Sequence, residues 1–157
     1  MKINFVCVGK LKEEYYKKAQ AEYTKMLGRF CDVHIIEVSD DPLAHVKIGK
    51  GEQAVKTVEG KRVLEKCAGF VVACDGRGKQ MGSEQFSRKI EDIMLGGGSE
   101  ITFVVGGSLG LSDEVRGRAD MVLSFSKMTL PHRLFRVVLL EQVYRAFKIM
   151  RGETYHK

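Results

Sequence analysis

ITFVVGGSLG, at residues 101–110, decides the fold of this chain, because an apolar run gives way at once to a glycine-rich turn. The five residues from Ile101 to Val105 include two valines, an isoleucine and a phenylalanine, which is typical of a short strand buried on both faces. Gly106 and Gly107 follow, and glycine both tolerates positive φ and lets another group approach the backbone. We therefore expect a positive-φ turn at these two glycines, open to a ligand.

The segment after this turn predicts a short helix, a strand and a long helix. Ser112 precedes two acidic residues, which is a typical helix start. MVLSFS, at residues 121–126, reads as a strand, and the loop behind it ends at Pro131, where a long helix should begin. Gly152 is placed to end that helix. The helix is apolar around nearly its whole circumference, so it is either a central core helix or one shared with a second subunit.

Strand-like and helix-like segments also alternate upstream. Apolar runs at 3–8, 32–38 and 69–75 predict strands, and amphipathic segments within 11–30, 52–66 and 83–94 predict helices, the last capped by Ser83. This alternation indicates an α/β fold with a mostly parallel sheet flanked by helices. Ligands of such sheets bind beyond the carboxyl ends of the strands. Three strand ends are candidates: Cys74–Asp75, Gly106–Gly107 and Phe125–Ser126.

The composition is that of an ordinary soluble protein. The chain has 157 residues, of which 44% are hydrophobic and 29% charged, so we expect one domain. It contains no signal peptide and no run near the ~20 apolar residues that a membrane helix needs, which predicts a cytoplasmic protein without membrane contact. The four cysteines form no C-x-x-C pair, so we expect reduced thiols and no metal.

Positive charge gathers near the end of the chain. The formal net charge is +6, and residues 127–157 carry seven Lys or Arg against two acids. Solvated lysines would explain this, and so would a face that contacts phosphates of a polyanionic partner. A dinucleotide site is disfavoured, because no G-x-G-x-x-G follows the first strand, and there is no P-loop motif.

Four motifs together resemble the ribosomal RNA large subunit methyltransferase H family, which belongs to the SPOUT class. They are Val105–Leu111 (VGGSLGL), Leu123–His132 (LSFSKMTLPH), Glu141–Ala146 (EQVYRA) and Tyr155–Lys157 (YHK). The match runs the length of the chain. The resemblance implies a single SPOUT methyltransferase domain over residues 1–157, with a C-terminal trefoil knot and a knotted cofactor-binding region at about 101–157. It also implies a homodimer that depends on S-adenosyl-L-methionine.

The resemblance also implies a set of cofactor contacts. Carried over by position, they are Cys74, Gly106, Phe125, Ser126, Lys127, Met128, Thr129 and Leu130. Position 74 is commonly Leu in the family, so Cys74 is a departure. A contact through the backbone or through apolar bulk would tolerate this change.

The implied substrate is pseudouridine 1915 of 23S rRNA, methylated at N3 within the assembled ribosome. His156 is the candidate proton acceptor or orienting group, since the ordinary pKa of histidine lies near neutrality. Tyr155 is placed to stack on the base or hydrogen-bond to it. Arg136, Arg133 and Lys157 are candidates to hold phosphates or the developing anion.

A second hypothesis is a non-enzymatic RNA-binding or ribosome-binding α/β domain. It keeps the basic C-terminal region and predicts no small-molecule site. A methyl-transfer assay on ribosomes that lack the modification distinguishes the two.

Overall fold

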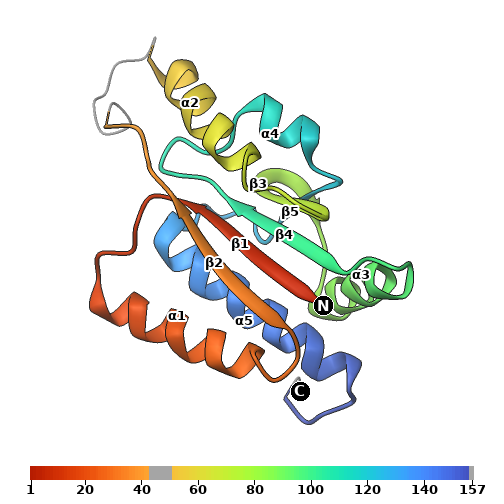
Figure 1. Cartoon of the computed structure of the whole chain (residues 1–157). Helices are drawn as coiled ribbons and strands as arrows, with labels where there is room; N and C mark the ends of the chain where they lie inside the picture. The colour runs from red at the N-terminus through yellow and green to blue at the C-terminus, as the bar shows by residue number, and fades with distance from the viewer. Residues whose placement is uncertain (43–50, 156–157) are drawn as a thin grey trace.

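A five-stranded parallel sheet forms the centre of the computed structural model, which describes residues 1–42 and 51–155 (Figure 1). The strand order within these residues is β2-β1-β4-β3-β5, and every pairing is parallel. The strands are β1 (Lys2–Val8), β2 (Asp32–Val38), β3 (Phe70–Gln80), β4 (Glu100–Val105) and β5 (Met121–Ser124). The predicted α/β class with a mostly parallel sheet is confirmed.

Helices cover both faces of the sheet (Figure 1). On one face lie α1 (Glu14–Leu27), α3 (Ser83–Leu95) and α5 (His132–Met150), and on the other lie α2 (Glu52–Leu64) and α4 (Asp113–Arg118). Side chains of β1 alternate between the two layers, as the period of a strand requires. Phe5 packs in the core beneath α5, whereas Val6 packs in the smaller core beneath α2.

Strand β3 is longer than its apolar pattern predicts. The sequence indicates a strand at 69–75 and a loop behind it, but β3 continues to Gln80, with a register irregularity between Cys74 and Lys79. Leu123 of β5 pairs with both of these residues. A Cβ on Gly78 would lie 2.6 Å from the backbone N and C of Leu123, so only glycine lets the two backbones approach here. The second half of β3 is held by backbone pairing and its residues are mostly exposed, so no apolar pattern in the sequence predicts it.

Helix α5 lies against both α1 and α3. Every residue of the helix is buried or partly buried, which agrees with its apolar circumference. Leu139 and Leu140 face the core, whereas Val137 and Val138 remain partly exposed. The core interpretation therefore holds for one side of the helix, and contact of the other side with a second subunit stays a prediction. The strand order does not test the trefoil knot, which also stays a prediction.

Three of the four predicted helix signals are confirmed. The Ser112 hydroxyl accepts a hydrogen bond from the Val115 amide at 3.2 Å and caps α4. Helix α5 begins directly after Pro131, and Gly152 follows its end with a φ of +63°. The prediction that Ser83 caps α3 is wrong. Ser83 is already helical, and its hydroxyl lies 2.8 Å from Oε1 of Gln142 on α5.

Arg136 joins α5 to the carboxyl end of β1. Its side chain is 2% exposed, and its guanidinium donates to the Val8 and Gly9 carbonyls at 2.7 Å and to Glu37 Oε1 at 2.9 Å. The Leu11 amide also donates to Glu37, at 3.1 Å. This ties the turn after β1, where Gly9 has a φ of +81°, to the long helix.

Replacing Arg136 with methionine tests this joint. Arg136→Met keeps most of the apolar bulk but leaves two carbonyls and Glu37 without their donor. We expect the free energy of unfolding in urea to fall by about 3 kcal/mol, since breaking a buried pair costs more than the pair contributes. Arg88→Met on the exposed face of α3 is the control, with an expected change below about 0.5 kcal/mol. A loss below about 1 kcal/mol for Arg136→Met would contradict the assignment.

Candidate functional site

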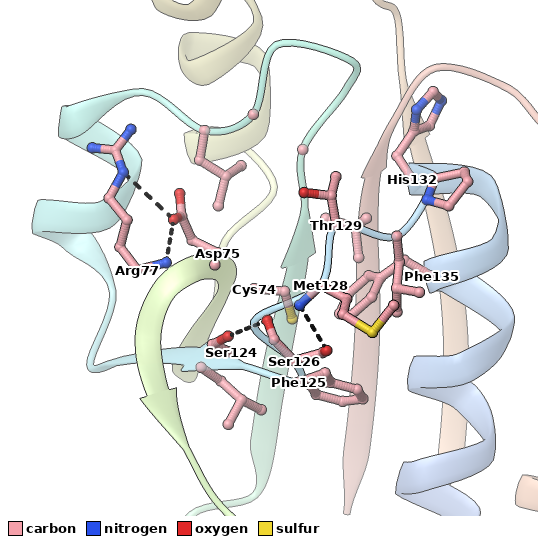
Figure 2. Close-up of a pocket in the computed structure, with 18 of the residues that line it drawn as sticks. Cys74, Asp75, Arg77, Ser124, Phe125, Ser126, Met128, Thr129, His132 and Phe135 are labelled. Carbon is pink, nitrogen blue, oxygen red and sulfur yellow. Dashed lines mark hydrogen bonds and ion pairs between the residues drawn. The ribbon is translucent and has the colours of Figure 1, made fainter.

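A pocket of about 530 Å³ opens at the carboxyl ends of β4 and β5, beside the middle of β3, where its register is irregular (Figure 2). Its lining comes from three segments that are far apart in the sequence. They are residues 74–77 within β3, residues 105–108 and 110–111 at the end of β4 and after it, and residues 123–132 with Phe135 around and after β5. A concave site at the carboxyl ends of parallel strands is the usual position for a ligand in this fold class.

All eight residues predicted to bind the cofactor lie in this pocket. They are Cys74, Gly106, Phe125, Ser126, Lys127, Met128, Thr129 and Leu130. The structure therefore brings together residues that the sequence separates by more than fifty positions. Their role in binding stays a prediction.

The loop at 125–130 is held by its own hydroxyl groups. The Ser124 hydroxyl donates to the Ser126 carbonyl at 3.1 Å, and the Ser126 hydroxyl accepts from the Met128 amide at 2.9 Å (Figure 2). The Phe125 ring packs edge-on against Phe135 of α5 at 4.9 Å between centroids. A loop fixed in this way presents its backbone groups at defined positions, next to an aromatic surface that suits a flat ring.

The glycine turn after β4 forms the opposite wall and differs from the prediction. The expected positive φ at Gly106 and Gly107 is wrong, because the left-handed residue is Gly110, with a φ of +82°. A Cβ on Gly106 would lie 2.9 Å from the Gly110 carbonyl carbon, and one on Gly107 would lie 3.1 Å from Val8 Cγ1. Glycine is needed here because the turn packs against itself and against β1, and a side chain at Gly106 would first open the turn.

Neither Cys74 nor Asp75 brings an unpaired charge to the pocket. Burial raises the pKa of the Cys74 thiol, so the thiol is uncharged and forms an apolar part of the pocket wall. Asp75 forms an ion pair with Arg116, with Nη1 and Oδ2 3.1 Å apart. The Arg77 amide donates to the other oxygen of Asp75 at 2.9 Å (Figure 2).

His132 is a pocket residue that the sequence reasoning did not single out. It lies at the start of α5, and burial, followed by the positive charges of Arg136 and Arg133, lowers its pKa. Its imidazole is therefore neutral at neutral pH. Its position directly after Pro131, next to the predicted loop, is the sequence feature that could have indicated it.

Of the predicted catalytic and substrate-binding residues, the three that the structure describes, Tyr155, Arg136 and Arg133, do not line this pocket. Tyr155 lies beyond the other end of α5, and His156 and Lys157 are outside the described residues. Both terminal nitrogens of Arg136 donate to groups inside the protein, and the side chain is buried, which does not favour direct contact with a substrate. Arg133 lines no part of the pocket either and forms an ion pair with Glu13.

Tyr155 belongs instead to a second polar cluster on α5. Its hydroxyl donates to Glu141 Oε1 at 3.2 Å, and the Arg145 guanidinium lies 4.7 Å from the centre of its ring. Glu141 also accepts from Arg145 Nε at 3.0 Å and from Gln142 Nε2 at 2.7 Å. The sequence reasoning assigned no role to Glu141 or Arg145, although their spacing of four residues places both on one face of the helix.

Neither a metal site nor a membrane helix is found in the part of the chain that the structure describes. Residues 1–42 and 51–155 contain no group of three His, Cys, Asp or Glu side chains arranged to hold a metal ion. Among the same residues, no helix combines the length and apolarity required to cross a bilayer.

Comparison with known proteins identifies relatives along the whole chain. A family model described as predicted SPOUT methyltransferase matches residues 1–156. Proteins named ribosomal RNA large subunit methyltransferase H from Clostridium kluyveri and Clostridium acetobutylicum are 49% and 52% identical to it. One named ribosomal RNA large subunit methyltransferase H 1, from Clostridium perfringens, is 53% identical. Each of these matches covers 100% of both chains.

Solved structures share the fold at low sequence identity. A probable methylase family protein from Haemophilus influenzae superposes with a TM-score of 0.57 at 13% identity, covering 99% of this chain and 70% of that one. A putative methyltransferase from Legionella pneumophila, solved with bound SAM, gives a TM-score of 0.52 at 13% identity, covering 94% and 66%. At this identity the likeness concerns the fold.

Titration of Tyr155 tests the second cluster. Burial, with the charge of Glu141, raises the pKa of Tyr155 from 10.0 to about 12. The raised pKa stabilises the folded state below pH 10, and this contribution is lost as the pH rises from 10 to about 12. The difference in tyrosinate absorbance between the wild type and Tyr155→Phe should show this late titration, and Glu141→Gln should shift it toward 10. Ionisation of Tyr155 near pH 10 in the wild type would contradict the contact.

Proposed function

The chain belongs to the ribosomal RNA large subunit methyltransferase H family of SPOUT methyltransferases, and from this premise we propose that it methylates N3 of pseudouridine 1915 in 23S rRNA of the assembled ribosome. Methylation of large-subunit rRNA with S-adenosyl-L-methionine follows from the family, and the nucleotide and atom are the more specific part of the proposal. Such an enzyme would act in the cytoplasm, where ribosomes are. The observation that carries the proposal is the meeting of the ends of β4 and β5 with the irregular middle of β3 in one pocket.

The pocket fits the methyl donor in size and chemistry. Its volume of about 530 Å³ lies in the usual range for small-molecule sites. Phe125 and Leu123 offer apolar contact to an adenine ring. The loop at 125–130, which the Ser126 hydroxyl helps to hold, offers backbone hydrogen-bonding groups. The family's trefoil knot over about 101–157 is part of this proposal, and it would account for bends so far apart in sequence lying against one another.

Methyl transfer requires this chain to orient the acceptor and to remove a proton. S-adenosyl-L-methionine supplies an electrophilic methyl group, whose bond to sulfur breaks as the bond to N3 forms. Holding donor and acceptor in line accounts for roughly 7–11 kcal/mol of the barrier. The N3 proton passes to a base, for which His156 is the first candidate. Glu141 is the second, supported by its contact with Tyr155.

We further propose that the enzyme is a homodimer in which the tail of one subunit completes the pocket of the other. Within one chain, His132 lines the pocket, and Glu141 lies nine residues further on, about 14 Å along the helix axis. The Glu141 cluster is therefore remote from the donor site of its own chain. The partly exposed Val137 and Val138 lie on the helix between the two and offer an apolar contact for a second copy.

The tail residue His156 is tested by separating binding from catalysis. His156→Ala should leave the affinity for S-adenosyl-L-methionine in calorimetry within about twofold, because the proposed donor contacts lie between Cys74 and Leu130 and the tail is assigned to the acceptor. Methylation of ribosomes that lack the modification should fall about 10²–10⁴-fold if His156 is the proton acceptor. His34→Ala, an exposed histidine on β2, is the matched control and should change neither quantity.

Three other outcomes are informative. Unchanged turnover by His156→Ala would remove this residue from the mechanism and leave Glu141. No binding by the wild type at millimolar S-adenosyl-L-methionine would refute the proposed function. Ribosome binding without methyl transfer would support the non-enzymatic alternative.

A mixed dimer tests whether the tail acts across subunits. One chain carries Gly106→Val, which disrupts the pocket wall, and the other carries Tyr155→Ala with His156→Ala. Each homodimer should be inactive, whereas a heterodimer isolated with two different affinity tags should regain one intact site of two and about half of the wild-type rate. An inactive heterodimer would show that the tail serves its own subunit.

A further inference from the structure

Glu59 is a buried carboxyl beneath the pocket that the proposed chemistry does not use. It lies on α2 and is 3% exposed. Its Oε1 accepts a hydrogen bond from the Asp41 amide at 2.9 Å, whereas Oε2 has no hydrogen-bond partner in the described part of the chain. A Cβ on Gly107 would lie 3.3 Å from that second oxygen. The free oxygen of Glu59 therefore faces the glycine turn that walls the pocket.

The next residue of α2 contacts the other end of the same turn. A Cβ on Gly60 would lie 2.5 Å from Ser112 Oγ, so the absence of a side chain lets α2 fit against the cap of α4. The turn therefore contacts α2 near both of its ends. Gly107 lies next to Glu59, and Ser112 lies next to Gly60, the following residue of the helix. The wall of the pocket between these two ends is supported from behind by α2.

The surroundings of Glu59 favour its neutral form. Burial raises its pKa most, the Asp41 amide opposes this, the charges of Asp40 and Asp41 raise the pKa further, and Arg62 lowers it. Arg62 is engaged with the Ser39 carbonyl at 2.8 Å. The turn itself, GGSLGL, brings no ionisable side chain, and the acids of α4 next to Ser112 are exposed. A neutral acid has an O–H to donate beside the turn, whereas an ionised one would place an unpaired charge there.

We propose that Glu59 is a positioning residue of the donor pocket, which acts as a buried neutral acid and, together with Gly60, holds the turn from Gly106 to Ser112 in its binding conformation. The proposal rests on the proposed function, since it concerns the same pocket. Glu59 touches neither reacting group and works through the backbone of Gly107. Ionisation of Glu59 loosens the wall and weakens the binding of S-adenosyl-L-methionine.

The sign of the pH dependence follows from the raised pKa of Glu59. The stabilisation is complete below the ordinary pKa of 4.5 and is lost as the pH rises through the raised value. The affinity of the wild type for the methyl donor should therefore decline on the alkaline side. Glu59→Gln has the same shape and stays neutral, so its affinity should not decline with pH in this way.

The experiment is calorimetry of the full chain with S-adenosyl-L-methionine from about pH 5 to pH 9, with thermal unfolding of each variant at the same pH values. Glu59→Ala should bind S-adenosyl-L-methionine about tenfold more weakly than the wild type does, and it should still unfold cooperatively. Displacement of the turn from Gly106 to Ser112 lowers the affinity although no residue that contacts the donor is removed. The KM of this variant for the donor should rise, with kcat little changed. Glu65→Ala, an exposed glutamate just beyond the same helix, is the matched control and should equal the wild type.

The outcomes separate this proposal from the function on which it rests. A wild type that binds no donor refutes the proposed function. A wild type that binds, with a folded Glu59→Ala that binds within twofold of it, overturns the positioning role. Should Glu59→Ala not fold, Glu59→Gln decides: a flat profile supports the proposal, and a decline parallel to that of the wild type overturns it.

Discussion

Parallel pairing of β3 with both β4 and β5 is the constraint on which the rest of the structure depends. Cys74 pairs with Val105 on one side and with Leu123 on the other. Neighbouring strands are about 4.8 Å apart, so these three residues form one row about 10 Å wide. Just beyond this row, β3 becomes irregular in register, β4 ends at Val105 and β5 ends at Ser124. The segments that follow the row therefore lie next to one another. The pocket follows from the register before any ligand is considered.

The helices then fix what the sheet brings together. Helix α5 supplies the start of the pocket wall at His132 and, through Arg136, also holds the turn after β1 from below. Helix α2 supports the glycine turn from the opposite face through Glu59 and Gly60. Helices on both faces of the sheet thus hold the segments that surround the pocket.

The class of fold and several helix ends could be predicted from the sequence, because they depend on local chemistry. The apolar run before Gly106, the cap at Ser112 and the proline at 131 act within a few residues. The features that could not be predicted depend on distant partners. Arg136 looks like a surface residue until the carbonyls at the end of β1 are placed beside it. The continuation of β3 past Cys74 is backbone pairing, which leaves no mark on the side-chain pattern.

The strand-end rule for parallel sheets already indicated Cys74, Gly106 and Phe125–Ser126 as neighbours. The full set of pocket residues that could bind the donor came only from the family resemblance, since neither spacing nor periodicity relates position 74 to positions 127–130. A crystal structure with S-adenosylhomocysteine tests the central claim most directly. We predict that the ligand lies between the turn at Gly106 and the loop from Phe125 to Leu130, with Cys74 against it. Ordered ligand at any other place, with this pocket empty, would contradict the account.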